Sequence, residues 1–188
     1  MPRKLKRPPN GDRTLTAYHE AGHAVAAAWL GIGFRYVTIK PDPKNNSLGH
    51  VRNHAMRFNP EVDLDQAANW RRYEHHFMVC YAGQVAEEIK WGSFDFAGSR
   101  KDHEEIFDLI TYHSMDEAIH KPFSEWLRAR TTALLLRRWQ GLEEFAAALL
   151  ERETIKSKEA QRIIFDAGMR RITAVVGEDG VVSAKYAD

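Results

Sequence analysis

The sequence has little of several features that would assign it to a specialised class. It contains a single cysteine, Cys80, so no disulfide can form within the chain, and we expect a reducing, cytoplasmic compartment. No run approaches the roughly 18 apolar residues that a membrane helix needs, so no membrane span is predicted. Lys and Arg number 27 against 26 Asp and Glu, a balance that gives no reason to expect a nucleic acid or an acidic surface as partner.

Positive charge gathers only near the N-terminus, where Arg3, Lys4, Lys6 and Arg7 precede two prolines. Such a run is typical of a solvated tail, so we predict that residues 1–13 form a disordered basic tail. An arm that docks electrostatically on DNA is the less favoured alternative. No apolar core follows these residues, so the stretch is not a signal peptide.

The length and the apolar content are those of one soluble domain. The chain has 188 residues, of which 44% are hydrophobic, enough for one core but cramped for two. We therefore predict one domain over residues 14–170, with a β-hairpin or tail over 171–188. The predicted fold class is mainly α with a small β-hairpin or sheet (α+β).

Apolar spacing and turn residues locate the elements of this fold. The first helix is expected from about Thr14, capped by Asp12 or Thr14, to Gly31 or Gly33. Two extended segments, 36–39 and 50–54, should pair as a hairpin. Further helices are expected over 65–89, 101–114, 142–150 and 159–169, together with one that has Pro122 in its first turn and runs to Leu136. Valine pairs predict a last hairpin over 172–184.

The chemistry of the chain points to the first helix, where His19, Glu20 and His23 form a His-Glu-x-x-His motif. Residues four apart lie on one face of a helix, so both imidazoles can reach one ion. Zinc accepts nitrogen ligands and keeps a position open for water in catalytic sites. Glu20 is angled off this face, from where its carboxylate can take a proton from the water. The motif therefore favours a zinc peptidase with Glu20 as general base.

Two histidines on a helix can also be inert surface residues, but this helix continues as the apolar run 24–30, where unpaired imidazoles would be costly to bury. A catalytic zinc site needs a third protein ligand. The metzincin extension is excluded because Ala26 and Trp29 stand where Gly and His are required. Spacing alone leaves ten candidates: His50, His54, His75, His76, Glu87, Glu88, Asp95, Asp102, His103 and Glu104.

Several segments beyond the motif resemble the peptidase domain of the FtsH-type ATP-dependent zinc metalloproteases. The resemblance spans roughly Thr14 to Phe165. The matching segments, in order, are Ala17-Tyr18-His19-Glu20-Ala21-Gly22-His23-Ala24, Val37-Thr38-Ile39, Ser47-Leu48-Gly49, Ala82-Gly83-Gln84-Val85-Ala86-Glu87-Glu88-Ile89, Gly98-Ser99-Arg100-Lys101-Asp102 and Ala146-Ala147-Ala148-Leu149-Leu150-Glu151. Several short motifs in the expected order are more specific than one.

The resemblance implies a zincin-like helical domain with Zn2+ held by His19, His23 and Asp102. It also implies that the segment comprising Gly49, His50, Val51 and Arg52 pairs with an extended substrate backbone, a form of β-augmentation. His103 is the main rival to Asp102 as third ligand. Glu87 and Glu88 are expected to be surface or structural carboxylates.

By this resemblance the expected function is a zinc-dependent endopeptidase that cuts flexible or unfolded polypeptides. The sequence has no Gly-x4-Gly-Lys-Ser/Thr loop, and the first helix is expected about a dozen residues from Met1, so we expect a stand-alone domain without the ATPase. A separate ATPase or adaptor would then deliver substrate, and a homo-oligomer would agree with the rings that the family forms. The alternative is a non-catalytic binding or regulatory module that keeps the fold and the zinc.

Overall fold

The computed structural model describes residues 6–42, 48–53, 67–96, 98–112, 117–169, 172–176 and 182–186. In this part of the chain most residues are helical and a small antiparallel sheet covers one side, so the predicted fold class is confirmed. None of the described helices combines the length and the apolar character needed to cross a membrane.

Helix α1 (Arg13–Leu30) is the centre of the fold. Asp12 caps its N-terminus by accepting a hydrogen bond from the backbone N–H of Thr14 at 2.7 Å. Gly31 ends it with φ 75°, a left-handed conformation that favours glycine. The residues from Leu15 to Ala27 are buried almost without interruption, as expected for a helix that is apolar nearly all round. The side chains that α1 carries are therefore surrounded by protein.

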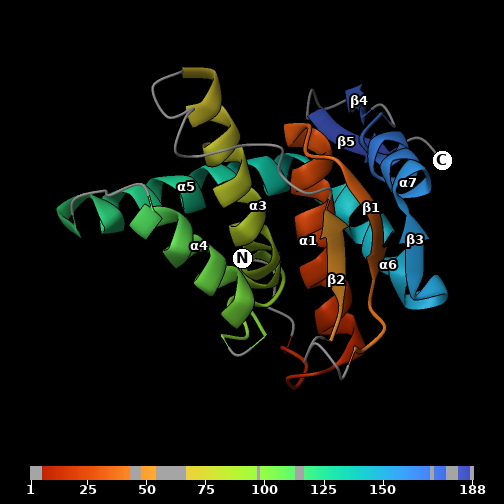
Figure 1. Ribbon diagram of the computed structural model, residues 1–188. Coiled ribbons are helices and arrows are strands. Elements are labelled where there is room, and N and C mark those ends of the chain that lie inside the picture. The colour runs from red at the N-terminus through yellow and green to blue at the C-terminus, as the bar shows by residue number, and fades with distance from the viewer. Residues whose placement is uncertain are drawn as a thin grey trace.

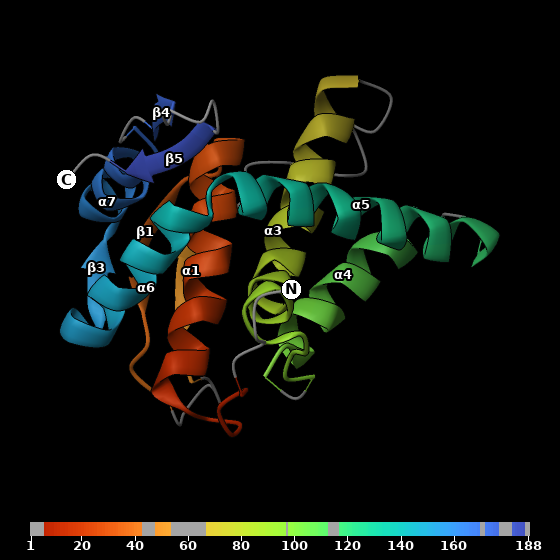
Figure 2. The same cartoon turned by 180° about the vertical axis from the view of Figure 1, so that it is seen from behind.

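Among the described residues, five further helices lie around α1 in two groups (Figures 1 and 2). These helices are α3 (Ala67–Trp91), α4 (Arg100–Tyr112), α5 (Glu117–Arg137), α6 (Trp139–Arg152) and α7 (Ser157–Met169). On one side α1 packs against α3, which in turn packs against α5 and α4; on the other side it packs against α6, with α7 beyond. The core therefore runs from α5 through α3 and α1 to α6.

The placement of Pro122 differs from the prediction. Helix α5 begins at Glu117, so the proline lies inside the helix and not in its first turn. A proline early in a helix removes only one intrahelical donor, and the flanking residues are good helix formers. The helix can therefore start upstream of the residue that suggested its beginning.

A three-stranded antiparallel sheet has the order β2-β1-β3, with β1 (Phe34–Thr38) in the middle. Strand β2 (His50–Asn53) pairs with it as predicted, with Thr38 opposite His50. Strand β3 (Thr154–Lys156) was not predicted; it joins the other edge of β1 with Thr154 opposite Thr38. Three residues between two helices are too few for a strand pattern to be recognised. Strand β2 is consequently an edge strand of this sheet.

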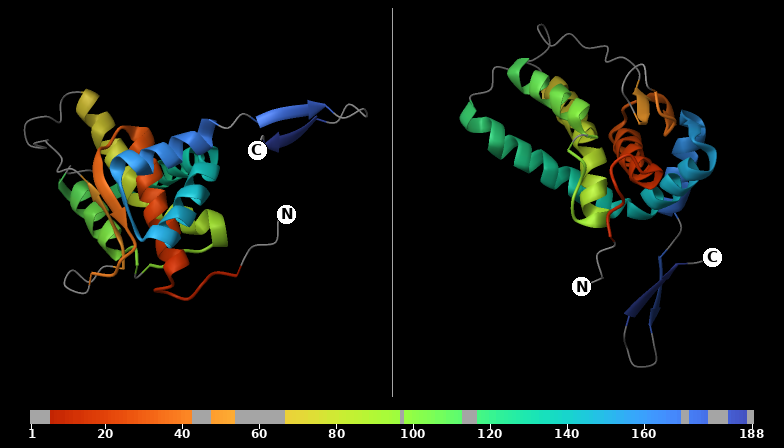
Figure 3. Two further views of the ribbon diagram at one scale, coloured as in Figure 1. Left: turned by 90° about the vertical axis from the view of Figure 1, so that its right-hand side faces the viewer. Right: turned by 90° about the horizontal axis from the view of Figure 1, so that it is seen from below.

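The predicted C-terminal hairpin forms from β4 (Ile172–Val176) and β5 (Val182–Tyr186), with Val176 opposite Val182. Figure 3 shows it beside the helical body rather than within it. The turn predicted between the two strands, and His54, lie outside the described residues. At the other end, part of the segment predicted as a tail contacts the body, because Arg7 and Asn10 reach acidic side chains of the α3 region.

Candidate metal centre and adjoining cleft

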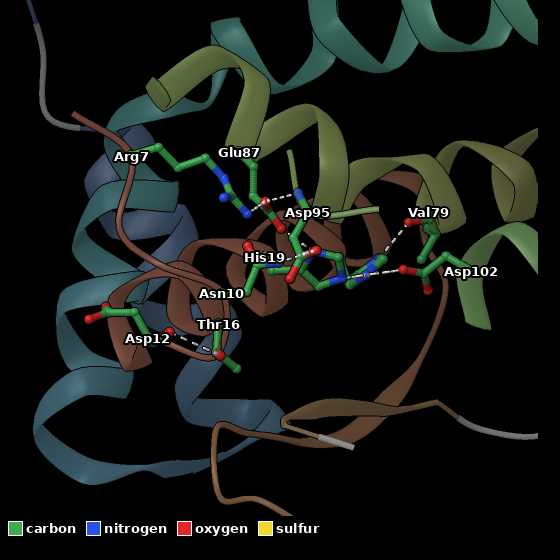
Figure 4. A network of polar contacts seen from close by, with 10 residues as sticks. Arg7, Asn10, Asp12, Thr16, His19, Val79, Glu87, Asp95 and Asp102 are labelled. Atoms are coloured by element: carbon green, nitrogen blue, oxygen red, sulfur yellow. Dashed lines mark hydrogen bonds and ion pairs between the residues drawn. The ribbon is translucent and has the colours of Figure 1, made fainter. Parts of the chain in front are cut away.

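Two helices bring three ligand-type side chains to one point. His19 and His23 lie one turn apart on α1, and their Nε2 atoms are 3.0 Å apart. Asp102, in the first turn of α4, places Oδ2 at 3.2 Å from His19 Nε2 and 3.5 Å from His23 Nε2. Figure 4 shows the carboxylate of Asp102 directed toward the imidazoles. The side chains that the motif and the resemblance suggested as a metal site are therefore adjacent in space.

The other ring nitrogen of each histidine is also engaged. His19 Nδ1 lies 2.8 Å from Oε1 of Glu87, and His23 Nδ1 lies 2.7 Å from the carbonyl oxygen of Val79. A carboxylate and a carbonyl only accept, so both Nδ1 atoms donate, and a neutral imidazole then has a lone pair at Nε2. Two such lone pairs and a carboxylate face one another without a donor among them. A cation between them satisfies all three, and carboxylate or carbonyl partners are the usual supports of zinc-binding histidines.

The dimensions of this cluster fit zinc. Tetrahedral zinc with bonds of about 2.0–2.1 Å separates its ligand atoms by about 3.3 Å, and the three separations here are 3.0, 3.2 and 3.5 Å. Space is also left at the cluster, because Gly83 of α3 faces it. A Cβ built on Gly83 would lie 2.5 Å from His23 Nε2 and 2.6 Å from His19 Nε2. The absence of a side chain at Gly83 keeps the place between the imidazoles free.

The charges around the cluster favour a positive occupant. Burial lowers the pKa of the His19 imidazole, but the hydrogen bonds to Asp102 and Glu87 outweigh burial and hold it well above its usual value. Burial has the same effect on His23, and the charge of Asp102 again raises its pKa. For Asp102 burial raises the pKa, yet the two histidines bring it far below its usual range. The carboxylate is thus ionised and the site attracts a proton or a metal ion.

Glu20 lies on α1 beside His19 and is 5% exposed. Burial raises the pKa of its carboxyl group, and the two neighbouring histidines reduce that rise. The backbone before β2 approaches it closely, since a Cβ on Gly49 would lie 3.0 Å from Glu20 Cγ. Glu20 is therefore a buried carboxylate with a raised pKa, held between the histidines and the entry to β2.

A cleft of about 1320 Å3 opens beside these residues. His19, Glu20, His23 and Asp102 line it on one side, and on another side it is lined by the segment expected to bind substrate, Gly49, His50, Val51 and Arg52. In Figure 1, β2 stands on the side of β1 that is nearer α4. The edge of β2 that does not pair with β1 is therefore available to an extended chain in the cleft.

The other candidate ligands are held elsewhere, except His54, which lies outside the described residues. His103 stacks near Phe94 and Phe96 and contacts neither histidine of the motif. Glu88 forms two hydrogen bonds with Arg128, and His75 contacts the carbonyl oxygen of Leu30. Each of the remaining candidates has a polar partner of its own: His50 contacts Tyr36, His76 contacts Glu105, Asp95 accepts a hydrogen bond from Asn10, and Glu104 pairs with Arg100.

One face of α3 supports the candidate centre more than its residue types alone indicate. Val79, Gly83 and Glu87 recur every four residues, so they lie on one helix face, and that face supports both histidines. Glu87 is only 1% exposed, which excludes the surface alternative, and its second oxygen accepts a hydrogen bond from the backbone N–H of Asp95 at 2.8 Å. The spacing of these residues was a signal that the sequence did contain.

Comparison with known proteins identifies a family and relatives to which this chain is similar. Residues 8–113 match the model of peptidase family M41. The chain is similar to the ATP-dependent zinc metalloprotease FtsH of Thermus thermophilus, with 30% identity over 195 residues, covering 81% of this chain and 29% of that protein. It is also similar to ATP-dependent zinc metalloprotease FtsH 1 of Symbiobacterium thermophilum, with 30% identity over 189 residues, covering 87% and 30%. The chain thus spans less than a third of the length of these two relatives.

Proposed function

Because the chain belongs to peptidase family M41, we propose that it is a zinc-dependent endopeptidase that cuts flexible or unfolded polypeptides. The observation that carries this proposal is the approach of His19 Nε2, His23 Nε2 and Asp102 Oδ2 to within 3.5 Å of one another at the wall of a cleft. Zinc is the expected metal because the ligand set is two imidazoles and a carboxylate, and the relatives are named zinc metalloproteases.

In this proposal His19, His23 and Asp102 hold the ion, and Glu87 and the Val79 carbonyl orient the two imidazoles. When bound, zinc supplies a Lewis acid that polarises the substrate carbonyl and acidifies water. The carboxylate of Glu20 takes a proton from the attacking water and then passes it to the leaving amine. Its raised pKa suits this exchange, because a carboxyl group that both takes and gives a proton works best when its pKa approaches the working pH.

The substrate class follows from the cleft. An extended peptide can pair with the edge of β2 through main-chain hydrogen bonds, which depend little on side-chain sequence. Folded proteins rarely present such a strand, so we propose that the substrate is already unfolded or is delivered by an ATPase or adaptor. The two FtsH relatives are named ATP-dependent. A homo-oligomer is compatible with this delivery and is part of the same proposal.

The metal centre can be tested by replacing Asp102 with Asn in the protein as purified. The amide keeps the shape but removes the negative charge, so we expect the zinc affinity to fall at least 10–100-fold, the loss typical of even the outer supports of a zinc site. Competition with a chromophoric chelator measures the affinity, and digestion of unfolded casein measures activity. Asp108→Asn is a matched control, because Asp108 is exposed on the same helix.

Equal zinc affinities in the Asp102→Asn and Asp108→Asn variants would remove Asp102 from the metal site. If the unaltered protein binds one zinc and leaves casein intact, the peptidase proposal is wrong and the non-catalytic module is favoured.

The role of the β2 edge can be tested with substrates rather than with variants. N-methylation of a peptide amide removes one main-chain donor, so at a position that pairs with β2 it should cost about 1 kcal/mol or more of binding, a five- to tenfold rise in KM. A scan of singly N-methylated versions of one unstructured peptide should show sensitive positions that alternate, because every second residue of an antiparallel pair faces its partner strand. A uniform response along the peptide would contradict pairing with β2.

A further inference from the structure

A second group of ligand-type side chains lies next to the candidate zinc centre and takes no part in the proposed reaction. It consists of His76 and Cys80 of α3 and Glu105 of α4, and we refer to it as the His76–Cys80–Glu105 cluster. One ligand atom from each of the three lies within 4.8 Å of the other two. His76 and Cys80 are four residues apart, so they stack on one face of α3.

The cluster adjoins the candidate zinc centre on two helices. Glu105 follows Asp102 by three residues on α4, and Cys80 follows Val79, whose carbonyl oxygen accepts from His23. The two groups therefore share α4, while their other ligand side chains come from α1 in the candidate zinc centre and from α3 in the cluster. Both also line the same cleft, so an ion could enter the cluster from solvent through that cleft.

One buried polar atom of the cluster lacks a hydrogen-bond partner among the described residues. His76 Nε2 lies 2.6 Å from Glu105 Oε1, while His76 is 7% exposed and its buried Nδ1 has no hydrogen-bond partner among the described residues. Glu105 is half exposed, which gives the cluster an open side. Burial raises the pKa of the Cys80 thiol, and the negative charge of Glu105 adds to that rise. Without a cation the sulfur therefore keeps its proton.

We propose that the His76–Cys80–Glu105 cluster is a second metal site, selective for a borderline-soft divalent cation such as Zn2+ or Cd2+. The ligands would be one imidazole nitrogen, one thiolate sulfur and one carboxylate oxygen, a mixed set that zinc-type ions accept with tetrahedral geometry. Binding releases the thiol proton to solvent, and the neutral imidazole keeps its one proton on the ring nitrogen that does not coordinate; the sulfur, the other ring nitrogen and a carboxylate oxygen then supply lone pairs to the ion. Hard ions such as Mg2+ and Ca2+ prefer oxygen ligands and would not compete.

The single cysteine of the chain makes the site directly observable. Cadmium thiolates absorb in the ultraviolet by charge transfer, and the ligands of the candidate zinc centre contain no sulfur, so any such band must come from Cys80. We expect cadmium titration of the protein given one equivalent of zinc to produce the band and to saturate at one thiolate per chain. The band tests the second site whether or not the first site binds zinc or cleaves peptides.

Two variants identify the remaining ligands. Cys80→Ser should abolish the band, and Glu105→Gln should weaken cadmium binding at least about tenfold, since it removes a charged ligand. Glu104→Gln is the matched control, because Glu104 is the exposed neighbour on the same helix and pairs only with Arg100 among the described contacts. Circular dichroism establishes that each variant is folded, and the half-exposed Glu105 can be replaced without disturbing the core.

Absence of the band in the folded, unaltered protein at tenfold excess of cadmium would overturn the proposal. Equal cadmium affinity in the Glu105→Gln and Glu104→Gln variants would overturn it as well, because Cys80 would then bind the ion without the rest of the cluster.

Discussion

Replacement of Glu20 by Gln is expected to lower kcat for an unstructured peptide by about 1000-fold, in the middle of the range for loss of a general base. The amide has nearly the same shape but cannot take a proton from water. Zinc content should stay unchanged, because Glu20 has no place among the three ligand atoms. Metal analysis and single-peptide kinetics on the same sample measure both quantities.

The interpretation of this result depends on two comparisons. Glu151→Gln makes the same change on the exposed surface of α6 and should cleave as fast as the unaltered protein. A Glu20→Gln variant that loses zinc along with activity would show that Glu20 supports the metal rather than the water. Unchanged cleavage by Glu20→Gln would remove it from the mechanism altogether.

Replacement of Gly83 by Ala is expected to weaken zinc binding at the candidate centre of His19, His23 and Asp102 strongly while the fold persists. The new methyl group would lie 2.5 Å from His23 Nε2 and 2.6 Å from His19 Nε2, in the space that an ion would share. Both imidazoles are side-chain ends that can shift where backbone cannot. The shift disturbs their hydrogen bonds to Glu87 and the Val79 carbonyl, and this cost is offset in part because alanine is the better helix former by about 1 kcal/mol. We therefore expect zinc affinity at this centre to fall at least about 100-fold, since the ligands must be displaced, with little change in stability toward urea.

Gly22→Ala is the matched comparison, because the same methyl group meets backbone there. A Cβ on Gly22 would clash with the carbonyl oxygen of Ala82, at the contact between α1 and α3. Backbone cannot turn away, so we expect a loss of about 1–3 kcal/mol in the free energy of unfolding. Full zinc affinity in Gly83→Ala would contradict the placement of the ion between the imidazoles. Similar destabilisation of both variants would contradict the expectation that the methyl group costs less against side-chain ends than against backbone.

The helical part of the fold was predictable because its signals are local. Asp12 and Gly31 bound α1 where capping chemistry placed its ends, and the two valine pairs aligned the last hairpin. The start of α5 was missed because Pro122 seemed to mark a first turn. Strand β3 was missed because its three residues form a strand only through pairing with β1, a contact distant in sequence.

In the candidate site, too, the residues related by local geometry could be predicted from the sequence, whereas those related by tertiary packing could not. The relation of His19, Glu20 and His23 follows from helix geometry, so the motif was sufficient for it. The third ligand could not be chosen from spacing, because its position depends on how α4 packs against α3. Only the family resemblance suggested Asp102, and the structure places that side chain beside the two imidazoles. Glu87 was expected to be a surface or structural carboxylate, and its burial as the partner of His19 leaves only the structural alternative.

The pairing of β1 with β3 shows that the folding unit extends beyond the segment that matches the family model. The family match ends at residue 113, and every side chain of the candidate zinc centre precedes that point. Yet β1, which holds β2 beside the cleft, has its other edge occupied by residues 154–156, and α1 lies against α6. A chain shortened to the matched segment would retain the whole motif and leave β1 and one side of α1 uncovered. The minimal peptidase domain is therefore set by tertiary contacts that extend through the last third of the chain.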